Sequence, residues 1–281
     1  DLARARSRYP SDPVTQKLEQ LAVGARQLVY DSERKRRGVI SFLATGYWQL
    51  IRSRPGPLMA SLAVLLAPAL LAALWSWVDP AAATGLVPAQ FQGVLDGGST
   101  NQGLSLAEQS AFSAYLMTHN TQVAITAFSA GILWCLGTVW IIAQNGLLLG
   151  AVGGLLVQSG EGGFFLELVA AHGVLELSGI AVAGAAGLRM GWALVDPGRR
   201  RRREALTEEA RKAVLIVLGT IPVFIVAGLI EAFVSRSGFS ATPMVIVGLL
   251  VGGAYWGLVF WRGRSDSVRD DQTLASALAS M

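Results

Sequence analysis

Ionisable and amide side chains that interrupt apolar stretches are the residues of this chain whose types could do chemistry. The set comprises Asn120, Asn145, Glu167, His172, Glu176 and Glu231. His172 and Glu176 are four residues apart, so a helix would place them on the same face. Polar groups of this kind are costly in hydrocarbon, and where they occur they are usually paired or functional. We therefore take this set as the candidate site.

Three kinds of chemistry fit these residue types. His172, Glu176 and Glu231 could form a buried hydrogen-bonded network that fixes the register of neighbouring helices. The same three residues could bind zinc, although a complete His-Glu-x-x-His motif is absent. Glu176 or Glu231 could also relay protons or contact a solute on a pathway through the membrane. We favour the network, and we expect no metal and no other cofactor.

Motifs of common soluble enzymes are absent from the sequence. It contains neither a nucleotide-binding Gly-x-x-x-x-Gly-Lys-Ser/Thr loop nor a Gly-x-Ser-x-Gly nucleophile elbow. We therefore expect neither a transporter with its own ATPase nor a serine hydrolase, and we expect that the protein is not an enzyme.

Composition indicates a membrane protein. Of the 281 residues, 52% are hydrophobic and only 15% are charged, whereas about 25% are charged in an ordinary soluble domain. Four apolar stretches are each long enough to cross a bilayer as a helix, namely 58–78, 121–142, 213–234 and 243–261. We predict an all-α, polytopic helical membrane protein.

Two further apolar stretches have unusual lengths. Residues 147–157 follow a turn signal at Gln144–Gly146 and are too short for an ordinary crossing. This third segment is therefore predicted to be short or partly re-entrant. Residues 164–195 are too long for an upright crossing and must tilt, break or begin outside the hydrocarbon. The sequence thus predicts about six membrane segments.

The distribution of Lys and Arg predicts the orientation. Basic residues are concentrated in 1–57 and 196–212 and are absent from 79–120. Because basic residues favour the cytoplasmic side, we expect both termini and loop 196–212 inside, with 79–120 as an outer loop. The net charge of +4 reflects these flanking arginines and does not indicate a nucleic-acid partner.

This orientation predicts a common depth for the candidate site. The fourth span enters from outside, so His172 and Glu176 would lie below its outer end. Asn120 and His119 would lie at the outer start of the second span and Glu231 near the outer end of the fifth. We expect these side chains to meet in the outer half of the bilayer.

Three regions follow from the same pattern. They are 1–57 with cytoplasmic amphipathic and interfacial helices, 58–261 as the transmembrane domain, and 262–281 as a cytoplasmic tail. In the first region, apolar residues recur at helical spacing over 13–37, which favours an amphipathic helix.

Small residues and one arginine stand out within the spans. Gly150-x-x-x-Gly154 and Gly187-x-x-x-Gly191 are typical of closely packed membrane helices. They are compatible with a homodimer. Arg189, near the inner end of the fourth span, is expected to extend towards the lipid headgroups.

Short motifs in the middle spans point to a family. The motifs are Asn145–Gly150, Ala171–Ile180 running into Ala185–Arg189, and Ile221–Phe233. Together they resemble the stage II sporulation protein M family of bacterial integral membrane proteins. The His-Gly-x-x-Glu-Leu stretch that begins at His172 is the most specific part.

The resemblance implies a multi-pass protein of the bacterial inner membrane. Founding members of that family act in sporulation with peptidoglycan-degrading partners. The resemblance also implies that Asn145, His172, Glu176 and Glu231 occupy polar signature positions, and it assigns a catalytic role to none of them.

Our leading hypothesis is a non-enzymatic scaffold that recruits partners for cell-envelope or peptidoglycan remodelling. Its partners would be the lipid bilayer and other membrane or envelope proteins, with 13–37 and 79–120 as docking surfaces. One alternative is a transporter or permease that uses the polar cluster in the outer half of the bilayer. The other is an intramembrane metalloenzyme.

The predicted orientation can be tested by cysteine labelling of intact cells, in a variant whose native Cys135 is replaced by alanine. A membrane-impermeant maleimide should modify a cysteine introduced near residue 97 and should leave one introduced among residues 199–203 unmodified, because only the first lies outside. The reverse pattern would overturn the orientation.

Overall fold

The structure of the chain is a computed structural model that describes residues 13–14, 17, 38–96, 106–235 and 240–264. The chain divides into two compact units, one formed by Asp1–Gly46 with Ser265–Met281 and the other by Tyr47–Arg264. In the first unit, residues 38–41 are helical and continue into a π-helix, Phe42–Gly46. Most of the predicted helix 13–37 and of the tail 262–281 lies outside the described residues.

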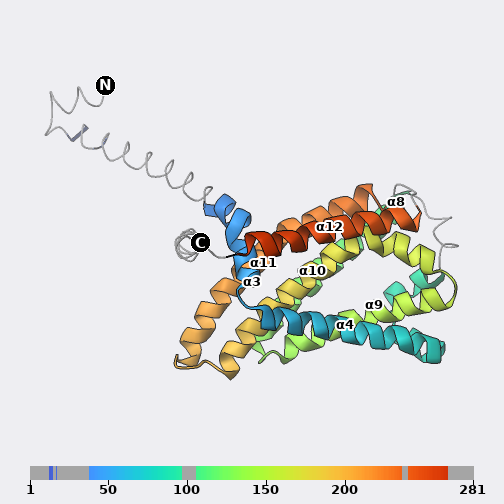
Figure 1. The fold of residues 1–281 in the computed structure, drawn as a ribbon, viewed down its shortest axis with the longest axis horizontal. Coiled ribbons are helices and arrows are strands. Elements are labelled where there is room, and N and C mark those ends of the chain that lie inside the picture. The colour runs from blue at the N-terminus through green and yellow to red at the C-terminus, as the bar shows by residue number, and fades with distance from the viewer. Residues whose placement is uncertain (1–12, 15–16, 18–37, 97–105, 236–239, 265–281) are drawn as a thin grey trace. The chain divides into compact units, whose positions relative to one another are not determined.

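The second unit, described by itself from here on, consists of helices wherever its described residues form regular structure (Figure 1). Its elements are α3 (Tyr47–Arg52), α4 (Pro55–Val78), α5 (Pro80–Thr84), α6 (Ala89–Gln92), η2 (Gly93–Asp96), α8 (Leu106–Ser129), η3 (Ala130–Ile132), α9 (Leu136–Gln158), α10 (Gly162–Val195), α11 (Arg202–Phe233) and α12 (Ala241–Arg262). Five of these, α4, α9, α10, α11 and α12, have the length and apolar composition to cross a membrane. The 24-residue α8 is the remaining long helix of this unit. The prediction of an all-α polytopic membrane protein is confirmed.

The second and third predicted segments have a different boundary in the structure. The chain turns at residues 130–135, between α8 and α9, and not at Gln144–Gly146, which lie inside α9. Helix α9 has 23 residues, or about 35 Å of helix. It is therefore neither short nor partly re-entrant, and the predicted boundaries 121–142 and 147–157 are wrong.

Local backbone geometry and close packing explain where this turn lies. Trp134 and Cys135 adopt left-handed conformations, with φ of 47° and 69°, which ends helical hydrogen bonding. A Cβ at Gly131 would lie 2.2 Å from the carbonyl oxygen of Gly187, so only glycine lets the turn approach α10 this closely. The Thr138 hydroxyl donates to the carbonyl oxygen of Ala127, at 2.6 Å, and so joins the two sides of the turn.

Helices α4 and α9 pack side by side through a stripe of glycines. Three glycines of α9, Gly146, Gly150 and Gly154, face Leu65, Ala69 and Ala73 of α4 in the same order. Because the order matches, the two helices run parallel. The chain must therefore cross the unit in the opposite direction after α4 and before α9, and α8 makes this return. The Asn-Gly pair predicted as a turn therefore belongs to a helix, because its glycine allows contact with the α4 backbone.

Helix α10 is the centre of the unit. It continues without interruption for 34 residues, and it packs against α4, α8, α9, α11 and α12. From Ser178 to Gly191 every residue is buried, which is typical of a helix surrounded by others on all sides. Figure 1 shows α10 crossing diagonally between α12 and the α4–α9 pair.

Helices α3 and α12 complete the packing around α10 and α11. Gly248 and Gly252 of α12 face Ala170 and Val174 of α10, which gives a second parallel pair. The buried hydroxyls of Tyr47, in α3, and Tyr255, in α12, share a hydrogen bond of 2.8 Å. Burial, together with the neighbouring Tyr255, raises the pKa of the Tyr47 phenol well above its usual value.

The first part of the predicted outer loop 79–120 is folded. The Asp79 carboxylate accepts a hydrogen bond from the Ala82 amide, at 3.0 Å, and caps α5. Val87 and Phe91 then pack with the buried Ala151 and Leu155 of α9. We call Asp79–Leu95 the outer cap. Residues 97–105 lie outside the described part, and 106–120 form the first turns of α8 rather than part of a loop.

Replacing Gly150 with alanine should destabilise the α4–α9 pair, because the new Cβ would lie 1.9 Å from the Ala69 carbonyl oxygen. We expect a loss of about 1–3 kcal/mol, which is typical of overpacking. Gly257 in α12 has open space around it, so Gly257→Ala should change stability by less than about 1 kcal/mol. Unfolding of both variants in detergent tests this, and equal losses would contradict it.

Candidate functional site

The outer-half cluster, named for its predicted depth, consists of Asn120, His172, Glu176 and Glu231 and begins with an imidazole and a carboxylate on neighbouring helices. His172 of α10 and Glu231 of α11 are 3% and 4% exposed, and their Nδ1 and Oε2 atoms are 2.6 Å apart. The Ser235 hydroxyl lies 3.3 Å from the same Nδ1 atom. A carboxylate this close to Nδ1 orients the ring and leaves Nε2 as the second polar atom of the imidazole.

A second polar pair lies one helical turn further along α10. The Asn120 side-chain amide, from α8, donates a hydrogen bond to Glu176 Oε2. Glu176 is also buried. Helix spacing puts His172 and Glu176 on one face of α10, so the two pairs bring α8, α10 and α11 together at one level. The predicted meeting of these four residues is observed.

A cavity of about 110 Å³ adjoins this cluster. Its polar lining consists of His119, Asn120, Asn145, His172 and Glu176, and its other walls are apolar. Phe91 of the outer cap lies edge-on to the His119 ring, with centroids 5.4 Å apart. The cap therefore covers this side of the cavity.

The remaining predicted residues have different positions. Glu231 contacts His172 from α11 but does not line the cavity. Glu167, on α10, is partly exposed. It does not line the cavity and is not part of the His172–Glu231 pair. The cavity also includes His119, which was expected beside Asn120 at the start of the second span.

The zinc hypothesis has no support from the described residues. Among them, no three His, Cys, Asp or Glu side chains gather closely enough to hold a metal ion. His172 directs its Nδ1 atom at Glu231, so this carboxylate orients the imidazole rather than completing a ligand set with it.

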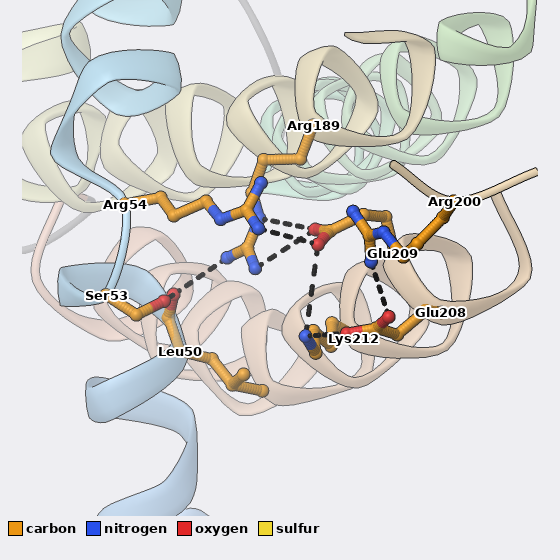
Figure 2. A network of polar contacts seen from close by, with 8 residues as sticks. All are labelled: Leu50, Ser53, Arg54, Arg189, Arg200, Glu208, Glu209 and Lys212. Carbon is orange, nitrogen blue, oxygen red and sulfur yellow. Dashed lines mark hydrogen bonds and ion pairs between the residues drawn. The ribbon is translucent and has the colours of Figure 1, made fainter. Parts of the chain in front are cut away.

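A second charged cluster, at the inner end of the unit, was not predicted (Figure 2). Glu209 of α11 is 1% exposed and Arg189 of α10 is 4% exposed. The Arg189 Nε and Nη2 atoms each lie 3.3 Å from Glu209 Oε2, and Arg54 Nη2 lies 2.9 Å from Oε1. Arg189 Nη1 also donates to the Leu50 carbonyl oxygen, at 2.9 Å. We call Arg54, Arg189 and Glu209 the inner clamp.

The inner clamp corrects the expectation that Arg189 extends towards the lipid headgroups. The arginine is buried instead, because Glu209 and the Leu50 carbonyl satisfy its guanidinium inside the unit. The sequence held one signal of this pairing. Arg189 lies six residues before the end of α10 and Glu209 seven residues after the start of α11, and antiparallel helices bring such positions together.

Glu208, beside Glu209, shows what an exposed pair looks like in the same region. It lies 2.5 Å from Arg200 Nη1 and 2.7 Å from Lys212 Nζ, and Figure 2 shows it between these two side chains. Its side chain is 48% exposed, against 1% for Glu209. The two adjacent glutamates therefore form a matched pair for measuring what burial contributes.

Glu209→Ala should strongly destabilise the unit, because it leaves the buried Arg189 without its carboxylate. We expect a loss of about 3–5 kcal/mol. Glu208→Ala removes only an exposed interaction and should cost less than about 1 kcal/mol. Unfolding of the two variants in detergent compares them directly, and similar losses would mean that the inner clamp contributes little.

Comparison with known protein families gave a match that spans most of this unit. The model of the family described as stage II sporulation protein M matches residues 61–236, which include the outer-half cluster and the inner clamp except Arg54. Neither the curated proteins nor the solved structures gave a significant match. The match covers more than half of the chain, from α4 to the end of α11. This chain therefore belongs to the stage II sporulation protein M family.

Proposed function

We propose that this chain is a non-catalytic scaffold of the bacterial inner membrane that recruits envelope proteins for peptidoglycan or cell-envelope remodelling. Family membership and the helical membrane fold support the general class. The observation that carries the proposal is the way in which the buried ionisable groups are used. Each of them contacts a polar partner on a different helix.

The pairing involves all five histidine, glutamate and arginine side chains that are buried in the described residues. These are His172, Glu176, Arg189, Glu209 and Glu231. At the outer level their contacts join α10 to α8 and α11. At the inner level they join α10 to α11 and α3, and α11 to the α3–α4 connection. Paired buried charges favour one arrangement of helices over others more than they add stability. A frame held at two levels suits a protein that must present surfaces in fixed positions.

Two surfaces are the proposed docking sites. On the outer side, the outer cap is a folded segment packed on α9, and it offers a shaped surface to envelope proteins. On the inner side, the predicted amphipathic helix 13–37 is the proposed site for cytoplasmic partners. With both termini inside, the protein could connect partners on the two sides of the membrane.

A permease is the second candidate, and the cavity beside Glu176 is the observation that favours it. The inner clamp lies further along α10, towards its opposite end. An outer cavity with a charged closure below it is compatible with a solute pathway that is closed on the inner side. In a permease, Glu176→Gln would abolish flux in reconstituted vesicles.

Recruitment can be measured by proximity labelling from the full-length chain in its native membrane. Deleting residues 1–37 should lower the labelling of cytoplasmic partners by about tenfold or more, since losing a docking segment removes at least about 1.4 kcal/mol. Glu176→Gln should leave labelling unchanged, because that residue faces the interior of the unit. Membrane insertion of both variants is the control.

The scaffold proposal would be wrong if the deletion left labelling intact. It would also be wrong if Glu176→Gln removed labelling as completely as the deletion, with membrane levels unchanged. The permease would then become the stronger candidate.

A further inference from the structure

A large apolar crevice lies beside the polar cavity. It has a volume of about 620 Å³ and is bounded by α4, α9 and the first half of α10. Its walls include Leu66, Leu70, Trp77, Val157 and Val174, together with four glycines. Because several of these side chains are exposed on the face that would contact lipid, the crevice opens sideways into the membrane.

The crevice and the cavity are neighbours in the strict sense that they share walls. Leu149, Phe165, Val169, Gly173 and Leu177 line both. The two spaces therefore adjoin at these residues, and Asn120, His172 and Glu176 lie on the side of the cavity. The combined space is apolar where it meets lipid and polar at the end that lies furthest from lipid, beside the outer-half cluster.

Charge at the polar end indicates which headgroup would fit. Two carboxylates and one imidazole gather there, and a proton on His172 would neutralise only one of the carboxylates. Glu176 is hydrogen-bonded by the neutral amide of Asn120. Neither lysine nor arginine occurs among the described residues that line the two spaces. A cation is favoured here, and an anion would face an unbalanced carboxylate in a medium of low dielectric constant.

We propose that the crevice and the cavity together bind one amphipathic lipid with an ammonium headgroup. The ammonium would lie in the cavity beside Glu176, and the apolar tail would lie in the crevice between α4 and α10. A transmembrane helix is a poor occupant, because a helix of about 10 Å diameter is too bulky for a polar cavity of about 110 Å³. The proposal goes beyond the scaffold function and does not depend on recruitment.

Three single-chain amphiphiles that share the same tail and differ only in the headgroup test this proposal directly. The probes are a photoreactive hexadecylammonium and its hexadecanol and hexadecanoate counterparts, added to the full-length protein in nanodiscs at neutral pH. Crosslinked residues are mapped by peptide mass spectrometry. We expect the ammonium probe to label α9 and α10 around the crevice, and to bind about tenfold more tightly than the carboxylate probe, a difference of about 1.4 kcal/mol.

Two variants separate the contributions of head and tail. Glu176→Gln should remove the preference for ammonium while keeping the labelling pattern, since the tail still fits. Val157→Trp should reduce labelling by all three probes, because the larger ring fills the mouth of the crevice. Their matched controls are Glu167→Gln, another α10 carboxylate that lines neither space, and Leu249→Trp, on the exposed face of α12. Both controls should behave like the unaltered protein.

The proposal fails if the three probes label equally, or if Glu176→Gln and Glu167→Gln have the same effect on the preference. It also fails if labelling is spread over the outer surface of α4 and α12 and unlabelled hexadecylamine does not compete. Should Val157→Trp not fold, this competition experiment and the Glu176→Gln variant still decide the outcome on their own.

Discussion

The structure depends on one constraint: α10 is surrounded by other helices and yet carries three of the five buried histidine, glutamate and arginine side chains of the described residues. A charge in such a position is tolerated only when a partner from a neighbouring helix satisfies it. His172, Glu176 and Arg189 therefore determine which faces α8 and α11 must present to α10. The outer-half cluster and the inner clamp are two consequences of this single requirement.

The same crowding explains the role of the small residues. Without a hydrophobic driving force between helices in lipid, association depends on close van der Waals contact. Glycines at regular spacing let α9 approach α4, and α12 approach α10, to backbone distance. Both pairs are parallel, so each requires another helix to return between its members. Close packing and the alternating path of the chain are thus two aspects of one arrangement.

The helices of the unit leave an open crevice beside the close contacts. The crevice opens between α4, α9 and the first half of α10, before the part of α10 that is buried on every side. The polar cavity adjoins the crevice on the side away from lipid. A frame that is fixed by ionic contacts at two levels can leave such a space open without collapsing onto it, because the positions of the surrounding helices do not depend on filling it.

The candidate site was largely predictable from the sequence, whereas its surroundings were not. His172 and Glu176 were recognisable because charged residues in apolar stretches are rare, and the charge distribution between spans put Glu231 and Asn120 at the same depth. Glu209 was not recognised, because a glutamate in a stretch rich in arginine is typical of an exposed cytoplasmic segment. Its burial depends on Arg189 and Arg54, which are 20 and 155 positions away along the chain.

The amino-acid sequence by itself determined the class of protein, its family motifs and the polar residues of the outer-half cluster, because hydropathy, charge and spacing are properties of the chain alone. Only the tertiary structure decided where α8 ends and α9 begins. An Asn-Gly pair that favours a turn in isolation is helical here, since Gly146 contacts the backbone of α4. The inner clamp and the crevice were likewise decided by which helices lie together, because the contacts that form them join residues from separate parts of the sequence.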